Sequence, residues 1–205
     1  MQIDSLRVLD RFVGIPLCFI CTLARRLGRL FYSHSTADSP RKILIIKLSE
    51  MGSTVLAYPA LAEIRSRCPG AEIFFLVFKN NAAMVEALDL IPRTNIIPID
   101  YGSPVLLLRT GFAAVRLLLS ERIDTVIDMD FFSRLTALLS FLVCRGNRVG
   151  FHRYHDEGLY RGDLLTHRVL YSAHVHTSVA FMALALSLFD APDDEPHYRG
   201  WIDPA

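Results

Sequence analysis

The chain has 205 residues, of which 52% are hydrophobic and 21% are charged, so it can bury a sizeable core and does not have the composition of a disordered protein. Its 22 Lys and Arg against 21 Asp and Glu leave a net charge of +1. The chain therefore lacks the large basic excess that is typical of nucleic-acid-binding proteins, which disfavours that class. The length suits one large domain or two small ones and is too short for many two-domain enzymes.

Residues 12–23 form a nearly continuous apolar run (FVGIPLCFICTL), followed by Arg25, Arg26 and Arg29. The run is well short of the about 20 apolar residues that span a bilayer, and no small-residue cleavage site follows it. It predicts an apolar helix within residues 1–33, with two interpretations left open. The helix either lies on a membrane surface with its arginines at the level of the lipid phosphates, or packs on the chain's own core.

The four cysteines are scattered along the chain, and Cys18 and Cys21 form a CxxC pair. A zinc site needs a second pair of ligands, and a thioredoxin-type site needs a preceding strand. We therefore predict buried apolar cysteines, no metal site and a reducing cytoplasmic location. If the N-terminal helix lies on a membrane, the protein is expected to be peripheral on the inner face of the cytoplasmic membrane.

Short β-branched runs alternate with longer apolar-striped stretches over residues 41–189. Buried strands are predicted at 42–48, 72–78, 95–99, 125–128 and 148–151, helices at 54–68, 80–88, 105–120, 133–143 and 174–189, and a loop at 153–166. This alternation predicts an α/β fold, a Rossmann-like parallel sheet with helices on both faces, preceded by the apolar N-terminal helix. Pro98 indicates that the third strand lies at an edge. The acidic, proline-rich residues 190–205 are predicted to be a linker or the start of a further domain.

Ligands of open parallel sheets gather outside the carboxyl ends of the strands. The loop after the first predicted strand contains Ser49, Glu50, Gly52, Ser53 and Thr54. Gly52 permits close approach of a ligand to the backbone, and the helix that follows offers free N–H groups to an anion or a sugar hydroxyl. In the alternative interpretation, Ser53 or Thr54 only caps that helix. The loop is neither a dinucleotide-binding nor a Walker motif, which disfavours a small nucleotide-binding protein.

Two carboxylates, Asp128 and Asp130, follow the fourth predicted strand, and Arg134 comes four residues later. Such a pair could bind a metal or act as acid and base, and it also occurs by chance or as a local cap. Arg134 could hold one of the carboxylates or a substrate anion. The last two loops place Arg153 and Arg161 among histidines, which suits an anionic ligand, with solvated loop charge as the alternative.

These residues resemble a known family. Residues 42–61 (KILIIKLSEMGSTVLAYPAL) are similar to the opening of glycosyltransferase family 9, the ADP-heptose:lipopolysaccharide heptosyltransferases. That opening is a buried strand, a Ser-x-x-Gly-Asp loop and a helix carrying Leu-Pro-Ala-Leu. Later segments match in the same order, namely 65–73 (RSRCPGAEI), 124–128 (DTVID), 148–151 (RVGF) and the His-containing stretch from residue 174. The resemblance covers about residues 41–189.

The resemblance implies the N-terminal, acceptor-side half of a GT-B architecture, in which a second Rossmann-like domain binds the nucleotide-sugar donor. It implies inverting transfer without a metal or cofactor from a nucleotide-sugar, ADP-heptose foremost, to a lipid-linked saccharide of the lipopolysaccharide type. The donor domain is expected to lie outside this chain, and nucleic acid is not expected as a partner.

The chain departs from the family pattern at three positions. The family's proposed catalytic Asp, directly after the loop Gly, is Ser53 here, and a serine cannot act as a general base unaided. We predict that Glu50 takes this role, with Asp130 in reserve. Asp130 stands where the family usually has Gln, and Phe131 replaces the next Gly. The predicted substrate-binding residues are Ser49, Gly52, Ser53, Thr54, Asp130, Arg134, Arg153 and Arg161. Ser53 and the missing donor domain also leave open a non-catalytic saccharide-binding module or remnant.

Overall fold

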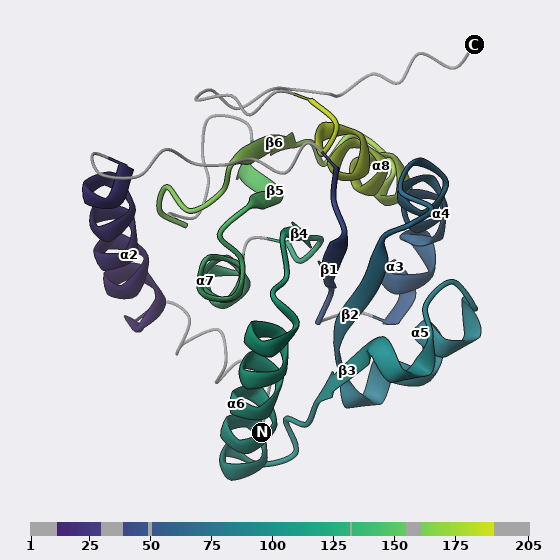
Figure 1. The fold of residues 1–205 in the computed structure, drawn as a ribbon, viewed down its shortest axis with the longest axis horizontal. Coiled ribbons are helices and arrows are strands. Elements are labelled where there is room, and N and C mark those ends of the chain that lie inside the picture. The colour runs from purple at the N-terminus through teal and green to yellow at the C-terminus, as the bar shows by residue number, and fades with distance from the viewer. Residues whose placement is uncertain (1–11, 30–38, 49–50, 132, 155–160, 191–205) are drawn as a thin grey trace.

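The computed structural model describes residues 12–29, 39–48, 51–131, 133–154 and 161–190, and these residues form a helix-covered sheet (Figure 1). Within them, six parallel strands pair in the order β3-β2-β1-β4-β5-β6. The strands are β1 Lys42–Ile46, β2 Glu72–Phe78, β3 Ile96–Ile99, β4 Thr125–Asp128, β5 Asn147–Tyr154 and β6 His167–Tyr171. The predicted Rossmann-like α/β fold is therefore confirmed.

The helices connect the strands and cover both faces of the sheet (Figure 1). They are α2 Gly14–Arg29, α3 Met51–Leu56, α4 Tyr58–Arg67, α5 Ala82–Ala87, α6 Pro104–Glu121, α7 Arg134–Val143 and α8 Thr177–Ser187, with short 3-10 helices η1 Lys79–Asn81 and η2 Arg93–Asn95. Alternate residues of β1 show the two cores. Ile43 and Ile45 pack with residues of α4, α5 and α8, whereas Leu44 and Ile46 pack with residues of α6 and α7.

The observed elements differ from the predicted ones in four main respects. The predicted helix 54–68 begins at Met51 and is divided at Ala57 into α3 and α4, with Pro59 in the first turn of α4. Proline lacks an N–H and its ring clashes with the carbonyl four residues before it, so it ends one helix and starts the next. The strand β6 lies where no strand was predicted, and β5 runs on to Tyr154, into the predicted loop 153–166. The last helix begins at Thr177 rather than at residue 174.

Strand β3 lies at one edge of the sheet, where Pro98 lacks the N–H that a second neighbouring strand would need. The edge position predicted from Pro98 is confirmed. Strand β6 forms the other edge among the described strands, and it is only partly buried. The first two of its five residues are His167 and Arg168. The strand therefore lacks the continuous apolar run that indicates a buried strand in a sequence.

Helix α2 is docked on the domain by one narrow stripe of residues. Gly14, Cys18, Thr22 and Arg25 are buried, and the apolar contacts of the stripe are to α7 and Leu164. Thr22 Oγ1 accepts a hydrogen bond from the backbone N–H of Asp163 (2.8 Å), and Arg25 Nη1 lies 2.7 Å from Asp163 Oδ1. The helix thus packs on the chain's own core, as one interpretation held, while its other faces remain exposed. Among the described residues, no helix has the length and apolarity needed to cross a bilayer.

Candidate functional site

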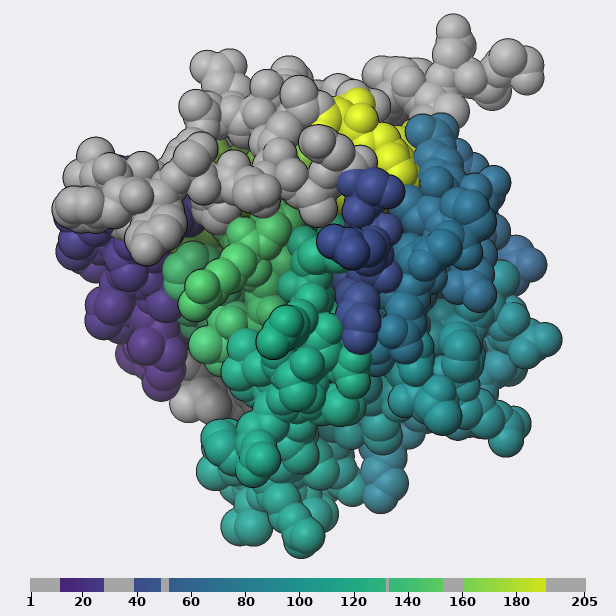
Figure 2. Space-filling model, viewed as in Figure 1, coloured from purple at the N-terminus to yellow at the C-terminus, as the bar shows by residue number. Residues whose placement is uncertain are grey.

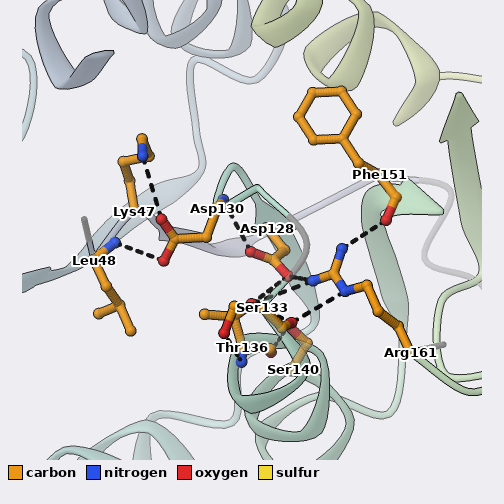
Figure 3. Close-up of polar contacts among 9 residues, drawn as sticks. All are labelled: Lys47, Leu48, Asp128, Asp130, Ser133, Thr136, Ser140, Phe151 and Arg161. Carbon is orange, nitrogen blue, oxygen red and sulfur yellow. Dashed lines mark hydrogen bonds and ion pairs between the residues drawn. The ribbon is translucent and has the colours of Figure 1, made fainter. Parts of the chain in front are cut away.

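The carboxyl end of β4 carries a buried polar network that starts at Asp128 (Figure 3). Asp128 Oδ1 accepts a hydrogen bond from the N–H of Asp130 (3.1 Å), and Asp128 Oδ2 accepts one from Thr136 Oγ1 (2.8 Å). The same oxygen pairs with Nη2 of Arg161. Thr136 lies in the first turn of α7, where the side chain of Ser133 caps the helix by accepting from the Thr136 N–H. Asp128 therefore ties the end of β4 to the start of α7.

Arg161 occupies the centre of this network and is 2% exposed. Its Nε donates to the carbonyl of Ser133 (3.0 Å), and its Nη1 donates to the carbonyl of Phe151 (2.6 Å). With Asp128 and Thr136 on Nη2, the guanidinium joins β4, β5 and the start of α7. A buried arginine whose N–H groups are used in this way stabilises the strand ends and has little capacity left for a substrate anion. The predicted substrate contact of Arg161 remains a prediction.

Asp130 points away from Asp128, toward the end of β1 (Figure 3). Its Oδ1 lies 3.2 Å from Lys47 Nζ, and its Oδ2 accepts from the N–H of Leu48 (3.0 Å). Lys47 is fully buried, and Nζ also sits 5.4 Å from the centre of the Phe131 ring. Strand β4 ends at Asp128, before Asp130. The carboxyl groups of Asp128 and Asp130 contact different partners.

Lys47 and Thr136 belong to this network and were missed in the sequence. Lys47 could have been found from its place in the otherwise apolar run 43–48. A lysine that is buried with such a run needs a charged partner, which indicates a nearby carboxylate. Thr136 carried no such signal, since its position next to Asp128 depends on how α7 packs.

Phe131, at the position where the family usually has Gly, joins an aromatic cluster beside the network. Its ring stacks on Phe151 and Phe181, with centroids 5.6 Å apart in both cases, and meets Tyr171 edge-on at 5.1 Å. These partners come from β5, α8 and β6. The cluster packs the strand ends firmly, because aromatic pairs in these geometries add to the stabilisation from burial.

The first predicted loop is described in part. Ser49 and Glu50 lie outside the described residues. Gly52, Ser53 and Thr54 lie inside α3 rather than before it, so neither Ser53 nor Thr54 is its N-cap. A Cβ added to Gly52 would meet nothing within 4 Å, so packing within the chain does not require glycine there.

The residue from which this loop departs is held at both its N–H and its carbonyl group. Leu48 directly precedes Ser49 in the sequence, and its N–H donates to Asp130 Oδ2. Its carbonyl accepts from Asn81 Nδ2 (3.3 Å). Side chains from the segment after β4 and from η1 therefore position the backbone at the base of the loop that carries Glu50.

The remaining predicted residues do not gather at one place. Arg134 is 4% exposed, and its side chain lies so close to Gly14 of α2 that a Cβ added there would be 2.9 Å from Arg134 Cβ. Arg153 lies in β5, paired with Leu170 of β6. Asp128, Asp130 and Arg161 are brought together by the fold, and α2 covers Arg134. Among the described residues, no group of three His, Cys, Asp or Glu side chains could hold a metal ion.

Burial dominates the electrostatics of Asp128. Desolvation raises the pKa of its carboxyl from 3.8 to about 6, and the nearby charge of Asp130 adds to this, while Arg161 and the hydrogen bond from Thr136 oppose it. Between these two values the folded protein retains a proton that the unfolded chain has released. Asp128 therefore makes the free energy of unfolding fall as the pH rises from about 4 to about 6.

This dependence can be measured by urea unfolding at several pH values across that range, with Asp128→Asn as the matched variant. The wild type should lose more stability than Asp128→Asn as the pH rises, because the variant has no carboxyl to titrate. Parallel pH profiles for the two proteins would show that Asp128 does not titrate in this window.

Comparison with solved structures finds a similar fold in glycosyltransferases. The E. coli heptosyltransferase WaaC, solved with ADP-2-deoxy-2-fluoro heptose, superposes with a TM-score of 0.58 and 19% identity over 75% of this chain and 50% of that chain. WaaC solved with ADP gives the same TM-score and identity. A family 9 glycosyltransferase from Veillonella parvula matches with a TM-score of 0.58 and 14% identity, over 80% of this chain and 45% of that one. No protein-family profile and no curated protein sequence matches the chain.

The structural matches confirm, at the level of the fold, the resemblance noted in the sequence. The chain spans about half the length of each of these three solved structures. It has the fold of one half of a GT-B enzyme, in which two Rossmann-like units lie on either side of the active site.

Proposed function

We propose, from the premise that this chain has the fold of one half of a family 9 heptosyltransferase, that it is the acceptor-binding half of an inverting glycosyltransferase. The donor would be a nucleotide-sugar, ADP-heptose foremost, bound by a second Rossmann-like unit. The acceptor would be a lipid-linked saccharide of the lipopolysaccharide type at the cytoplasmic membrane face. The observation that carries this proposal is the structural match over one half of enzymes of that class, one of them solved with a heptose nucleotide.

In the proposed reaction, the carboxylate of Glu50 takes the proton of an acceptor hydroxyl. The hydroxyl oxygen then forms a bond to the anomeric carbon of the donor sugar from the face opposite the diphosphate. The bond from that carbon to the diphosphate breaks, and the nucleoside diphosphate leaves with the electron pair. This step needs no metal or cofactor from this chain. The backbone of Ser49, Gly52, Ser53 and Thr54 would line the acceptor side, near the base of the loop that Asp130 holds at Leu48.

The buried network supports a positioning role for Asp130 rather than the role of a reserve base. Asp130 is 3% exposed, and its two carboxyl oxygens contact Lys47 and the backbone of Leu48. A group that abstracts a proton must reach the acceptor hydroxyl, and a carboxylate enclosed in this way is poorly placed to do so. Glu50 is therefore the residue that we propose as the base.

Separate titrations of the two substrates test the assignment of this chain to the acceptor side. Calorimetry should detect binding of a lipid A-type saccharide acceptor to the chain and no comparable binding of ADP or ADP-heptose. Tight binding of the nucleotide by this chain alone would overturn the assignment.

The role of Glu50 is tested by Glu50→Gln in the enzyme complete with a donor-binding half. We expect turnover to fall by about 10²-fold, because the amide cannot accept the proton, while acceptor affinity changes little. Glu63→Gln, the same substitution at a partly exposed glutamate of α4, is the matched control and should retain most of the activity. Unchanged turnover in Glu50→Gln would show that this glutamate is not the base.

A second candidate function is a saccharide-binding module without transferase activity. It is favoured by Ser53, which stands where the family has its proposed catalytic Asp. The two functions differ in their products, because only the transferase releases nucleoside diphosphate in an acceptor-dependent manner. Acceptor binding without such release, in the presence of a donor-binding half, would support the module.

A further inference from the structure

Helix α2 has the reverse of the polarity expected for a helix between a protein core and water. Its buried stripe contains the polar Thr22 and the charged Arg25, whereas its outward positions are mostly apolar. Large apolar side chains on the outward faces are 51–62% exposed, namely Phe19 (62%), Ile20 (59%), Leu23 (51%) and Leu27 (52%). A helix that faces water carries its polar residues outward. The outward face of α2 is therefore suited to an apolar environment.

Helix α6 shows a second exposed apolar face. Ala114 and Leu118 of this helix are buried against the sheet. On the opposite side, Val105 and Leu108 are each 73% exposed, and Phe112 is 67% exposed. Spacings of three and four residues place these side chains on one face of the helix.

Two exposed arginines interrupt that apolar face. Arg109 and Arg116 stand three and four residues from Phe112 on either side, so they neighbour it on the outward surface of α6. An arginine in this position can lay its aliphatic stem along apolar neighbours while its guanidinium reaches a phosphate.

Helices α2, α7 and α6 lie on one side of the sheet, with α7 in contact with both of the others (Figure 1). Leu135 and Leu142 of α7 are 51% and 57% exposed. Figure 1 shows the three helices along one flank, away from α4 and α8, and Figure 2 shows α2 in purple and α6 in teal on that side. The outward surface of these three helices is called here the α2–α7–α6 face.

The charge of this face is one-sided. Among the described side chains, its three helices expose three arginines, Arg26, Arg109 and Arg116, while Arg25 and Arg134 are buried. The helices contain a single acid, Glu121, which lies 2.5 Å from Lys42 Nζ. Helices α3, α4, α5 and α8, on the other side of the sheet, contain two arginines and two glutamates. Apolar side chains interspersed with more exposed arginines than acids match the surface of a bilayer with anionic lipids.

We infer that the α2–α7–α6 face docks on an anionic lipid bilayer. The aliphatic and aromatic side chains enter the boundary between headgroups and acyl chains, and Arg26, Arg109 and Arg116 reach the lipid phosphates. A second copy of the chain fits the face less well, because a two-fold interface would bring arginines against arginines without acids to pair them. The inference goes beyond the proposed reaction, since it extends the surface from the N-terminal helix to α6 and does not depend on any sugar chemistry.

The docked orientation places the candidate site beside the membrane. Helix α6 begins shortly after the carboxyl end of β3, and α7 begins shortly after that of β4. Val105 and Leu108, in the first turns of α6, therefore lie toward the edge of the sheet from which the Glu50 loop departs. A lipid-linked acceptor could reach that edge without leaving the bilayer.

Vesicle co-sedimentation of the full chain tests the inference. Wild-type protein should bind vesicles of phosphatidylcholine mixed with phosphatidylglycerol, and bind pure phosphatidylcholine much more weakly. The double variants Leu108→Ser/Phe112→Ser and Phe19→Ser/Ile20→Ser should each lower the partition coefficient by roughly tenfold. Val55→Ser/Tyr58→Ser, which alters side chains 43% and 45% exposed in α3 and α4, is the matched control and should bind like the wild type.

The charged part of the surface is tested separately by Arg109→Gln/Arg116→Gln. We expect a loss of about fivefold for each arginine on anionic vesicles and little change on neutral ones. This variant removes no buried contact, so it remains informative if an apolar variant fails to fold, which circular dichroism would reveal.

Three results would overturn the inference. The first is equal binding of the wild type to neutral and anionic vesicles, and the second is an equal loss of binding in the Val55 and Tyr58 control. The third is a wild-type dimer in analytical ultracentrifugation that the Leu108 and Phe112 substitutions dissociate, which would assign the face to a second copy. Because the vesicles contain no saccharide, failure here is distinct from failure of the proposed transferase function.

Discussion

Arg161→Met is expected to lower the free energy of unfolding by about 3–5 kcal/mol at neutral pH, because it leaves the carboxylate of Asp128 buried without its charged partner. Asp128 is fully buried, and its remaining partners are Thr136 and the N–H of Asp130. The substitution also leaves the carbonyl groups of Ser133 and Phe151 without the donors that now bind them. Urea unfolding followed by circular dichroism measures the loss.

A double variant separates the ion pair from the rest of the network. Arg161→Met combined with Asp128→Asn should recover on the order of 1–3 kcal/mol relative to Arg161→Met alone, because no uncompensated charge stays buried. Glu63→Gln is the control for a surface pair, since Glu63 and Arg67 are 2.6 Å apart and partly exposed. The free energy of unfolding should fall by no more than about 0.5 kcal/mol in this variant. A similarly small loss in Arg161→Met would contradict the stabilising role of the buried pair.

Gly146→Ala is expected to destabilise the protein by about 3 kcal/mol through a backbone clash. A Cβ at residue 146 would lie 2.1 Å from the carbonyl oxygen of Asp124, which also accepts the N–H of Asn147 (3.0 Å). Asp124 cannot move freely, because its Oδ2 accepts from the backbone of Arg41 and Lys42 at the start of β1. The clash would therefore be transmitted to the starts of β1, β4 and β5 together.

Gly111→Ala provides a matched control of the opposite sign. Gly111 lies within α6, and a Cβ added there would meet nothing within 4 Å. Alanine is more favourable than glycine in a helix interior. The free energy of unfolding of this variant should therefore rise by about 0.5–1 kcal/mol. Thermal unfolding of the two variants beside the wild type gives the comparison. Equal effects in both would show that the clash at Gly146 is relieved at little cost.

The candidate site was predictable only in part from the sequence. Asp128 and Asp130 were singled out because they follow a buried strand, and the fold does place them at the carboxyl edge of the sheet. Their partners were not predictable, since Arg161 reaches Asp128 from 33 residues along the chain. The direction in which each carboxyl group points depends on the packing of α7 and β1. Glu50 was proposed from the resemblance and lies outside the described residues.

The apolar surfaces of α2 and α6 were also predictable only in part from the sequence. The apolar run at residues 12–23 left two interpretations open, because periodicity does not show which side of a helix meets the core. The structure buries Thr22 and Arg25 in the docking stripe and leaves Phe19 and Ile20 outward. The second apolar surface, on α6, could be recognised only when the burial of Ala114 and Leu118 showed which face points away from the sheet.

The sequence by itself determined the α/β class, the positions of strands β1 to β5 along the chain and the edge position of β3. Those features follow from local patterns, because β-branched runs, helical spacing and proline each act over a few residues. Only the tertiary structure decided the strand β6, the burial of Arg161 and Arg134 and the outward face of α2. These depend on contacts between segments far apart in the chain, and the free energy of such contacts is set by the burial of both partners at once.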